Sequence, residues 1–287
     1  MIDAVVRPPA MLYTPSGDQP FGGYEYVNYR AEIDRALTKA ASVQESDAQR
    51  IMVVFGYPGN GKRAFCQELA RRLHAKSFHV LLLDVSSLIG ARGNEPEQAA
   101  EFIREALLST DQRPMLFVID GLDLLKPSLR ENPKLVSLRE VILFCSTDQC
   151  AERTLVVATA KSPDVAIGEF GPIDLPTLQF FNWPDPIKAA EFFRIMKVPT
   201  ADAVIGYIFT YCREQRLRYT AGSLINGARQ ALRMISSASE KNPGMAAPGE
   251  IEPKRLADLV MTFCTPTPED EARDYLIEHE VYLSRAI

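Results

Sequence analysis

The chain of 287 residues has few of the side chains that build metal centres or disulfide frameworks. It holds three histidines, one tryptophan and five cysteines, and no two cysteines are spaced as C-x-x-C. This pattern favours free thiols over a zinc site or a disulfide framework, so we expect a cytoplasmic protein. The sequence also lacks the ~18 uninterrupted apolar residues of a membrane-spanning helix and the basic-then-apolar start of a secreted chain, which predicts no membrane partner.

Positive charge is not in excess either. The 32 lysines and arginines are outnumbered by 37 aspartates and glutamates, which gives a net charge of −5. That balance argues against a nucleic-acid partner, which would need a broad basic surface. With 46% hydrophobic and 24% charged residues, the chain has an ordinary globular composition, enough for one large or two small domains.

A glycine-rich stretch at residues 56–63 is the strongest positive signal. It reads Gly-Tyr-Pro-Gly-Asn-Gly-Lys-Arg, between the apolar run Ile51–Phe55 and a helical repeat of Phe65, Leu69 and Leu73. In this strand–turn–helix context, a G-x-x-x-x-G-K loop holds phosphates with its backbone N–H groups and its lysine. The alternative is a glycine-rich turn without a ligand. The residues predicted to bind a nucleotide are Gly56, Tyr57, Pro58, Gly59, Asn60, Gly61, Lys62, Arg63 and Ala64.

The loop departs from its pattern at the last position. Ser or Thr normally stands there and ligates Mg²⁺ through its hydroxyl, whereas this chain has Arg63. A second metal ligand is predicted at Asp120, which ends the apolar run Met115–Ile119. Because the guanidinium of Arg63 could stand where Mg²⁺ would sit, we expect weak Mg²⁺ dependence. Asp123 is the candidate catalytic group that would act on water.

The chain divides into four segments by composition and periodicity. Strands predicted at 51–55, 80–84, 115–120, 154–159 and 178–181 alternate with helices, which indicates an α/β fold: the parallel sheet of a P-loop NTPase flanked by helices. A purely helical periodicity follows. The predicted segments are an extended proline-rich arm (1–20), the α/β nucleotide-binding subdomain (21–184), a small all-helical subdomain (185–264) and a linker with a peripheral helix (265–287).

Several segments, in this order, resemble the AAA+ ATPases over about residues 20–260. They are Phe21–Val27, Ser86–Glu97, Asp120–Asp123, Val157–Asp164 and Thr220–Leu232. The resemblance implies that Gly23 lines an adenine pocket, that the cofactor is ATP or ADP, and that the helical segment is the AAA+ lid. It also implies a homo-oligomer, or a hetero-oligomer with AAA+ subunits. The Ser162–Val165 segment and the lid are also similar to the second ATPase domain of N-ethylmaleimide-sensitive factor, which binds ATP mainly to hold a ring together.

The departures from the AAA+ pattern share a theme. Gly121 replaces the glutamate that polarises water, and Ala160 replaces the sensor asparagine. Glu169 stands where the arginine finger is expected, and Ala91 or Arg92 stands where the pore loop has an aromatic residue. These groups each carry orders of magnitude in rate, so the resemblance implies slow or absent hydrolysis. We expect a module that binds ATP or ADP and acts through nucleotide-stabilised assembly.

Three alternatives stay open. The chain could be a slow but genuine ATPase of the remodelling or chaperone type, with Asp123 or a neighbouring subunit supplying the missing groups. It could be a signalling switch of the STAND type, whose second motif often reads D-G-L-D, or a scaffold with an empty nucleotide site. The arm 1–20 and the segment 269–287 are the expected docking segments for protein partners, the latter because Tyr275, Leu276 and Leu283 fall near one helical face with Ile287 beyond.

Overall fold

The computed structural model describes residues 30–42, 50–89, 93–108, 113–125, 133, 135–144, 154–170, 177–241 and 251–280. Several predicted features fall outside this described part of the chain: the arm 1–20, Gly23, Ala91, Arg92, Leu283 and Ile287. Among the helices within it, none is long and apolar enough to cross a membrane.

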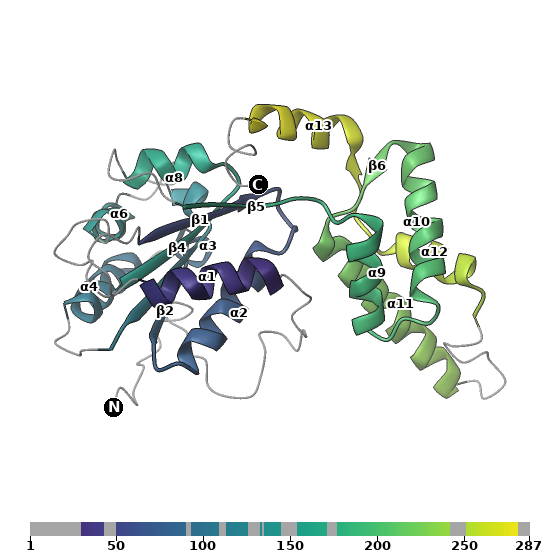
Figure 1. Cartoon of the computed structure of the whole chain (residues 1–287), viewed down its shortest axis with the longest axis horizontal. Helices are drawn as coiled ribbons and strands as arrows, with labels where there is room; N and C mark the ends of the chain where they lie inside the picture. Colours follow the sequence, from purple (N-terminus) through teal and green to yellow (C-terminus); the bar gives the residue numbers. More distant parts are fainter. Residues whose placement is uncertain are drawn as a thin grey trace.

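Five parallel strands form one sheet in the order β2-β3-β4-β1-β5 (Figure 1). Strand β1 pairs with β4 on one side and with β5 on the other, so that Val53 lies between Ala158 and Leu178 in register. This arrangement confirms the predicted parallel sheet flanked by helices. The strands are β1 (Ile51–Gly56), β2 (His79–Asp84), β3 (Met115–Asp120), β4 (Thr154–Ala160) and β5 (Thr177–Phe181).

Both faces of the sheet are covered by helices. Alternate strand residues face opposite sides. Val53 and Phe117 pack into a core with α4 and α6, whereas Val54 and Leu116 pack with α1 and α2. A strand buried on both faces is apolar throughout, which is why the sequence revealed these strands as continuous runs. The helices around the sheet are α1 (Arg30–Ser42), α2 (Lys62–His74), α3 (Val85–Ile89), α4 (Glu95–Leu107), α6 (Leu135–Phe144) and α8 (Pro163–Phe170).

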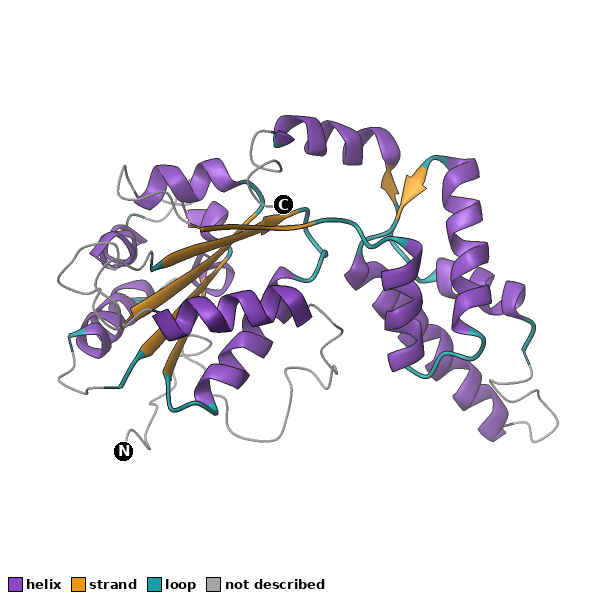
Figure 2. Ribbon diagram, viewed as in Figure 1, coloured by secondary structure: helices purple, strands orange, loops and turns teal. Residues whose placement is uncertain are grey.

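Four further helices form a second unit with a core of its own (Figure 2). The unit begins at α9, where the Asp185 carboxylate accepts the backbone N–H of Lys188 at 2.7 Å and Pro186 occupies the first helical turn. An acidic cap followed by proline is a strong helix start. The helices are α9 (Pro186–Ile195), α10 (Ala201–Gln215), α11 (Ala221–Lys241) and α12 (Pro253–Thr262).

A short ribbon and one helix return the chain to the sheet. Strand β6 (Leu217–Arg218) pairs antiparallel with β7 (Thr267–Pro268), so the predicted linker 265–268 is partly a strand. Helix α13 (Glu269–Glu278) follows directly and spans from the helical unit toward the sheet (Figure 1).

Helix α13 packs one face against the sheet unit. The Tyr275 side chain is only 5% exposed and Ala272 is fully buried. The ring centroid of Tyr275 lies 5.6 Å from that of Tyr57 and 5.8 Å from that of Trp183. The apolar face of α13 is therefore covered by this chain's own sheet unit, through a cluster of aromatic rings that are buried against one another.

Candidate functional site

The phosphate loop joins β1 to α2 and is in contact with the helical unit. Gly59 and Gly61 have φ angles of 87° and 95°, a left-handed backbone that favours glycine. A Cβ atom on Gly59 would lie 2.7 Å from the hydroxyl oxygen of Thr220 in the helical unit. The backbone N–H of Gly222, in the first turn of α11, donates to the carbonyl of Gly59 at 2.8 Å. The helical unit thus rests directly on the loop.

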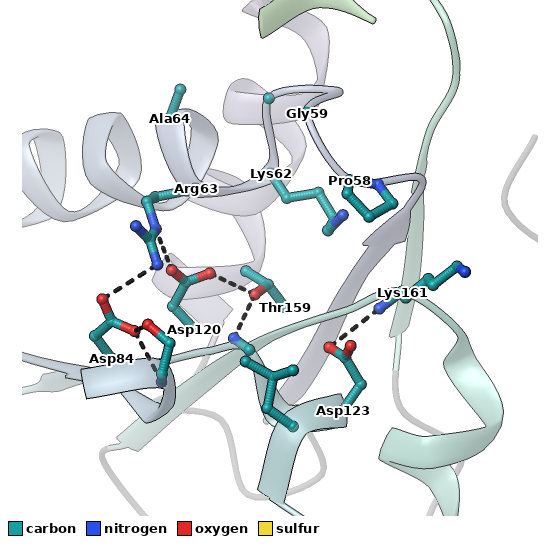
Figure 3. Close-up of a pocket in the computed structure, with 14 residues that line it drawn as sticks. Pro58, Gly59, Lys62, Arg63, Ala64, Asp84, Asp120, Asp123, Thr159 and Lys161 are labelled. Atoms are coloured by element: carbon teal, nitrogen blue, oxygen red, sulfur yellow. Dashed lines mark hydrogen bonds and ion pairs between the residues drawn. The ribbon is translucent and has the colours of Figure 1, made fainter. Parts of the chain in front are cut away.

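A cavity of about 440 Å³ opens beside the loop, within the size range of small-molecule sites. Its walls are the loop, the first turn of α2 and the carboxyl ends of β2, β3 and β4 (Figure 3). In parallel α/β sheets, ligands bind at this edge. The side chains that line it include Lys62, Arg63, Asp120 and Asp123.

Lys62 folds back over the loop. Its Nζ atom donates to the carbonyl of Gly56 at 2.5 Å and to that of Tyr57 at 3.2 Å. Burial lowers the pKa of the Lys62 ammonium to about 8, although the nearby carboxylates of Asp123 and Asp120 act to raise it. Because burial deprives the ammonium of hydration, an anion that contacts it stabilises its charged form strongly. A phosphate group is such an anion.

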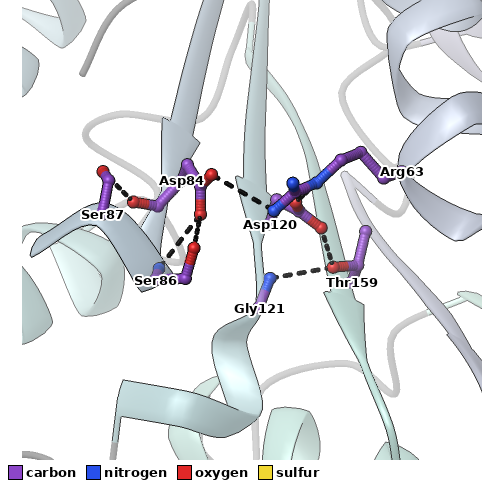
Figure 4. Close-up of polar contacts among 7 residues, drawn as sticks. All are labelled: Arg63, Asp84, Ser86, Ser87, Asp120, Gly121 and Thr159. Carbon is purple, nitrogen blue, oxygen red and sulfur yellow. Dashed lines mark hydrogen bonds and ion pairs between the residues drawn. The ribbon is translucent and has the colours of Figure 1, made fainter. Parts of the chain in front are cut away.

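Arg63 lies across the ends of two neighbouring strands (Figure 4). Asp84 and Asp120 are register partners that end β2 and β3, and the guanidinium donates to both: Nε to Asp120 and Nη2 to Asp84 at 3.2 Å. The remaining oxygen of Asp120 accepts from the Thr159 hydroxyl at 2.6 Å. That of Asp84 accepts from the backbone and hydroxyl of Ser86 at 3.0 and 2.5 Å. All four carboxylate oxygens therefore already have donors from this chain.

The same contacts stabilise the protonated, charged form of the Arg63 guanidinium. Burial acts to lower the pKa of the guanidinium, but Asp120 and Asp84 raise it by more, so the net shift is upward. The side chain nevertheless remains 58% exposed and faces the cavity. Arg63 is thus a permanent cation that a ligand in the cavity could reach.

Asp123 and Gly121 also line the cavity. Asp123 lies in the short helix η2 (Leu122–Leu124), and its Oδ1 atom accepts the backbone N–H of Lys161 at 3.2 Å. Gly121 has a φ of 83°, and a Cβ atom there would lie 3.1 Å from the Cδ1 atom of Leu124. A side chain at position 121 would therefore strain the turn, whereas Asp123 already reaches the cavity.

This arrangement agrees with the comparison with known families. Residues 52–170 match the family model described as ATPase family associated with various cellular activities (AAA). This part of the chain is therefore similar to an AAA domain. The match runs from β1 to α8 and so includes the phosphate loop, Asp120 and Asp123.

Two solved structures share the fold of the chain. A crystal structure of the FIGL-1 AAA domain has a TM-score of 0.63 at 14% identity, and the match covers 94% of this chain and 92% of that one. The structure of C. elegans PCH-2 has a TM-score of 0.52 at 13% identity, covering 83% and 68%. Such low identities concern the fold alone. No curated protein sequence matches the chain. None of these matches tests the expected likeness to the second ATPase domain of N-ethylmaleimide-sensitive factor.

An AAA domain implies nucleotide binding, usually with Mg²⁺, and the Mg²⁺ site does not fit these residues. Magnesium demands near-octahedral oxygen ligands. Position 63 offers a guanidinium, which has five donors and no acceptor, and that group occupies the Asp120 oxygen that a metal would use. The prediction of Asp120 as a metal ligand therefore meets a competing cation in the AAA domain itself.

The other predicted site residues fall in two groups. Pro58, Gly59, Gly61, Lys62, Arg63 and Ala64 line the cavity with Asp120 and Asp123. Gly56 and Tyr57 instead offer carbonyls to Lys62, and Asn60 is fully buried. Ala160, the last residue of β4, is buried, and the side chain of Glu169 lies outside the described residues.

Sequence reasoning alone did not identify Asp84, Ser86, Thr159 and Lys161, which also line the cavity. Asp84 carried the same signal as Asp120, a carboxylate that ends an apolar run. Recognising it required knowing that β2 and β3 are neighbours.

Proposed function

We propose that the chain is an AAA+ module that binds ATP or ADP, with ATP hydrolysis slow or absent. The observation that carries the proposal is the convergence of the phosphate loop, the Lys62 ammonium and the Arg63 guanidinium on one cavity. Two cations and a set of backbone N–H groups at the start of a helix suit the β- and γ-phosphates of a nucleotide. Calorimetry with ADP and ATP tests this binding. If no binding heat were measured at millimolar nucleotide, the proposal would be refuted.

Slow hydrolysis follows from the groups around the cavity. Gly121 has no carboxylate to polarise water, and the turn it occupies leaves little room for one. Ala160 offers a methyl group where an amide would orient the water. General bases and water-positioning groups contribute about 10²–10⁴-fold to rate. The Asp123 carboxylate is the one candidate base that we assign to the cavity, so a slow ATPase with Asp123 as base is the second candidate function.

We expect phosphate release from ATP well below the ~1 s⁻¹ at the low end of ordinary enzyme turnover. If residual turnover depends on Asp123 as a base, Asp123→Asn should lower it by about 10²-fold or more while nucleotide affinity stays nearly the same. A single-turnover assay with γ-³²P-ATP measures the rate, and calorimetry on the same variant supplies the affinity. Turnover of ordinary speed would contradict the proposal, and residual turnover unchanged in Asp123→Asn would remove Asp123 as the base.

We also propose that the module works in an assembly with itself or with active AAA+ subunits. On α10, the side chains of Tyr207 and Tyr211 stand one helical turn apart and are 46% and 40% exposed. Aromatic side chains that are grouped on a surface in this way mark protein contacts.

The free thiols of Cys66 and Cys212 suit a reducing cytoplasm, which stays a prediction.

Native mass spectrometry tests the assembly. We expect ADP to shift the protein toward a species of several subunits, because the nucleotide orders the loop on which α11 rests. The double variant Tyr207→Ser/Tyr211→Ser should weaken that species and leave ADP binding intact. Met234→Ser, which also changes a side chain exposed by 56% but on α11, serves as the control. A monomer at all concentrations, with and without nucleotide and with AAA+ partners added, would end this part of the proposal.

A further inference from the structure

The cation position between Asp84 and Asp120 is already filled by this chain. The carboxyl ends of β2 and β3 bring the two acids side by side, as register partners. A pair of carboxylates facing a bound phosphate would repel it unless a cation lay between them. Arg63 occupies that position, with Nε on Asp120 and Nη2 on Asp84 at 3.2 Å (Figure 4).

We propose that the Arg63 guanidinium takes the place of Mg²⁺, so that the module binds nucleotide phosphates without a divalent metal. The inference rests on the proposed nucleotide site. The guanidinium is planar, permanently charged and suited to bidentate contact with phosphate oxygens. Its contacts with the two acids use two of its five N–H donors, and its side chain is 58% exposed toward the cavity. Donors therefore remain for a ligand while the acids hold the group in place.

Asp84 gains a specific role in this arrangement as a positioning residue. A single carboxylate would let the long arginine side chain swing. Two carboxylates, each fixed by a second donor, define both ends of the guanidinium plane. Thr159 holds Asp120 at 2.6 Å, and Ser86 holds Asp84 through its backbone and hydroxyl. The acids that would have attracted a metal instead orient the group that replaces it.

The test is the metal dependence of ADP affinity, measured by calorimetry in EDTA and in excess Mg²⁺. For the wild-type protein we expect nearly equal affinities in the two conditions. Arg63→Ser restores the hydroxyl of the common loop pattern and frees one oxygen on each of Asp84 and Asp120. Its ADP affinity should fall by about tenfold or more in EDTA, the loss expected for a charged hydrogen-bond donor, and recover in Mg²⁺. Arg63→Lys keeps the charge and should stay independent of metal.

The outcomes separate the two proposals. Wild-type protein that binds ADP only with Mg²⁺ would overturn the inference about Arg63 and leave the nucleotide site standing. Wild-type protein that binds no ADP in either condition would overturn the nucleotide site itself. The wild-type comparison needs no variant, so it decides the inference even if Arg63→Ser folds poorly. For a folded Arg63→Ser protein, equal affinities in EDTA and Mg²⁺ would also count against it.

Discussion

Replacing Tyr275 by alanine is expected to release α13 from the sheet unit. The ring is 5% exposed, packs edge-on against Tyr57 and Trp183, and its hydroxyl donates to the carbonyl of Lys161 at 2.5 Å. Truncating a buried aromatic side chain of this size costs about 3–5 kcal/mol. Because α13 has few other buried side chains, the loss falls on the docking of this helix rather than on the whole fold.

Hydrogen–deuterium exchange reads this result directly. The amides of α13 should exchange far faster in Tyr275→Ala, while those of β1 and β3 stay protected. Tyr275→Phe is the matched control, since it keeps the ring and loses one hydrogen bond worth about 0.5–1.5 kcal/mol. Unchanged protection of α13 in the alanine variant would mean that other contacts hold the helix.

The docking of α13 also bears on the nucleotide site. Tyr57, its main partner on the sheet unit, is the second residue of the phosphate loop, and its hydroxyl donates to Glu271 of α13. That contact joins residues 214 positions apart in the sequence. A helix that was expected to dock partners therefore contacts the loop of its own chain. The large apolar residue that α13 leaves exposed is Ile277, at 61%.

The strands could be predicted because their environment leaves a local signature. All six residues of β1 are buried, and every residue of β4 is buried, so each appears in the sequence as an apolar run. The two-residue strands β6 and β7 have no such signature. Their pairing depends on the α10 and α12 helices bringing Leu217 and Pro268 together, which no local pattern records.

In the candidate site, too, some residues could be predicted from local sequence patterns and others could not. Lys62 and Asp120 were predictable because a loop motif and a strand end each identify one residue. The Arg63–Asp84–Asp120 cluster was not predictable in full, because it depends on strand order and on the direction of one long side chain. The substitution at position 63 showed that the metal site was altered. The sequence also suggested that the Arg63 guanidinium could stand where Mg²⁺ would sit, but the second acid that holds it, Asp84, followed only from the geometry.

Lys62→Met should have the largest effect on binding, lowering ADP affinity about 10- to 150-fold at neutral pH, which corresponds to the 1.5–3 kcal/mol of a charged hydrogen bond. The pH dependence identifies the cause. Since the Lys62 pKa is about 8 in the free protein and a bound phosphate raises it, wild-type affinity should decline as pH rises above about 8. ADP binding should take up protons in this range, which calorimetry in two buffers of different ionisation enthalpy detects. In Lys62→Met, this proton uptake and the decline in affinity should both disappear.

The stability of the unliganded protein should change with pH in the opposite direction. The pKa of Lys62 is lower in the folded protein than its ordinary value of 10.5, so the unfolded chain binds more protons between about pH 8 and 10.5. The Lys62 contribution to the free energy of unfolding therefore rises with pH across that window, and Lys62→Met removes it.

Lys161→Met is the matched control for these measurements. Lys161 also lines the cavity, but its side chain is exposed and its Nζ lies 5.8 Å from the centre of the Tyr57 ring rather than on the loop carbonyls (Figure 3). An exposed charge contributes about 0–1 kcal/mol, so ADP affinity should change by at most about fivefold. If the two methionine variants weakened binding equally, the cavity would be attracting phosphate through its general field, and the specific role of the Lys62 ammonium would be refuted.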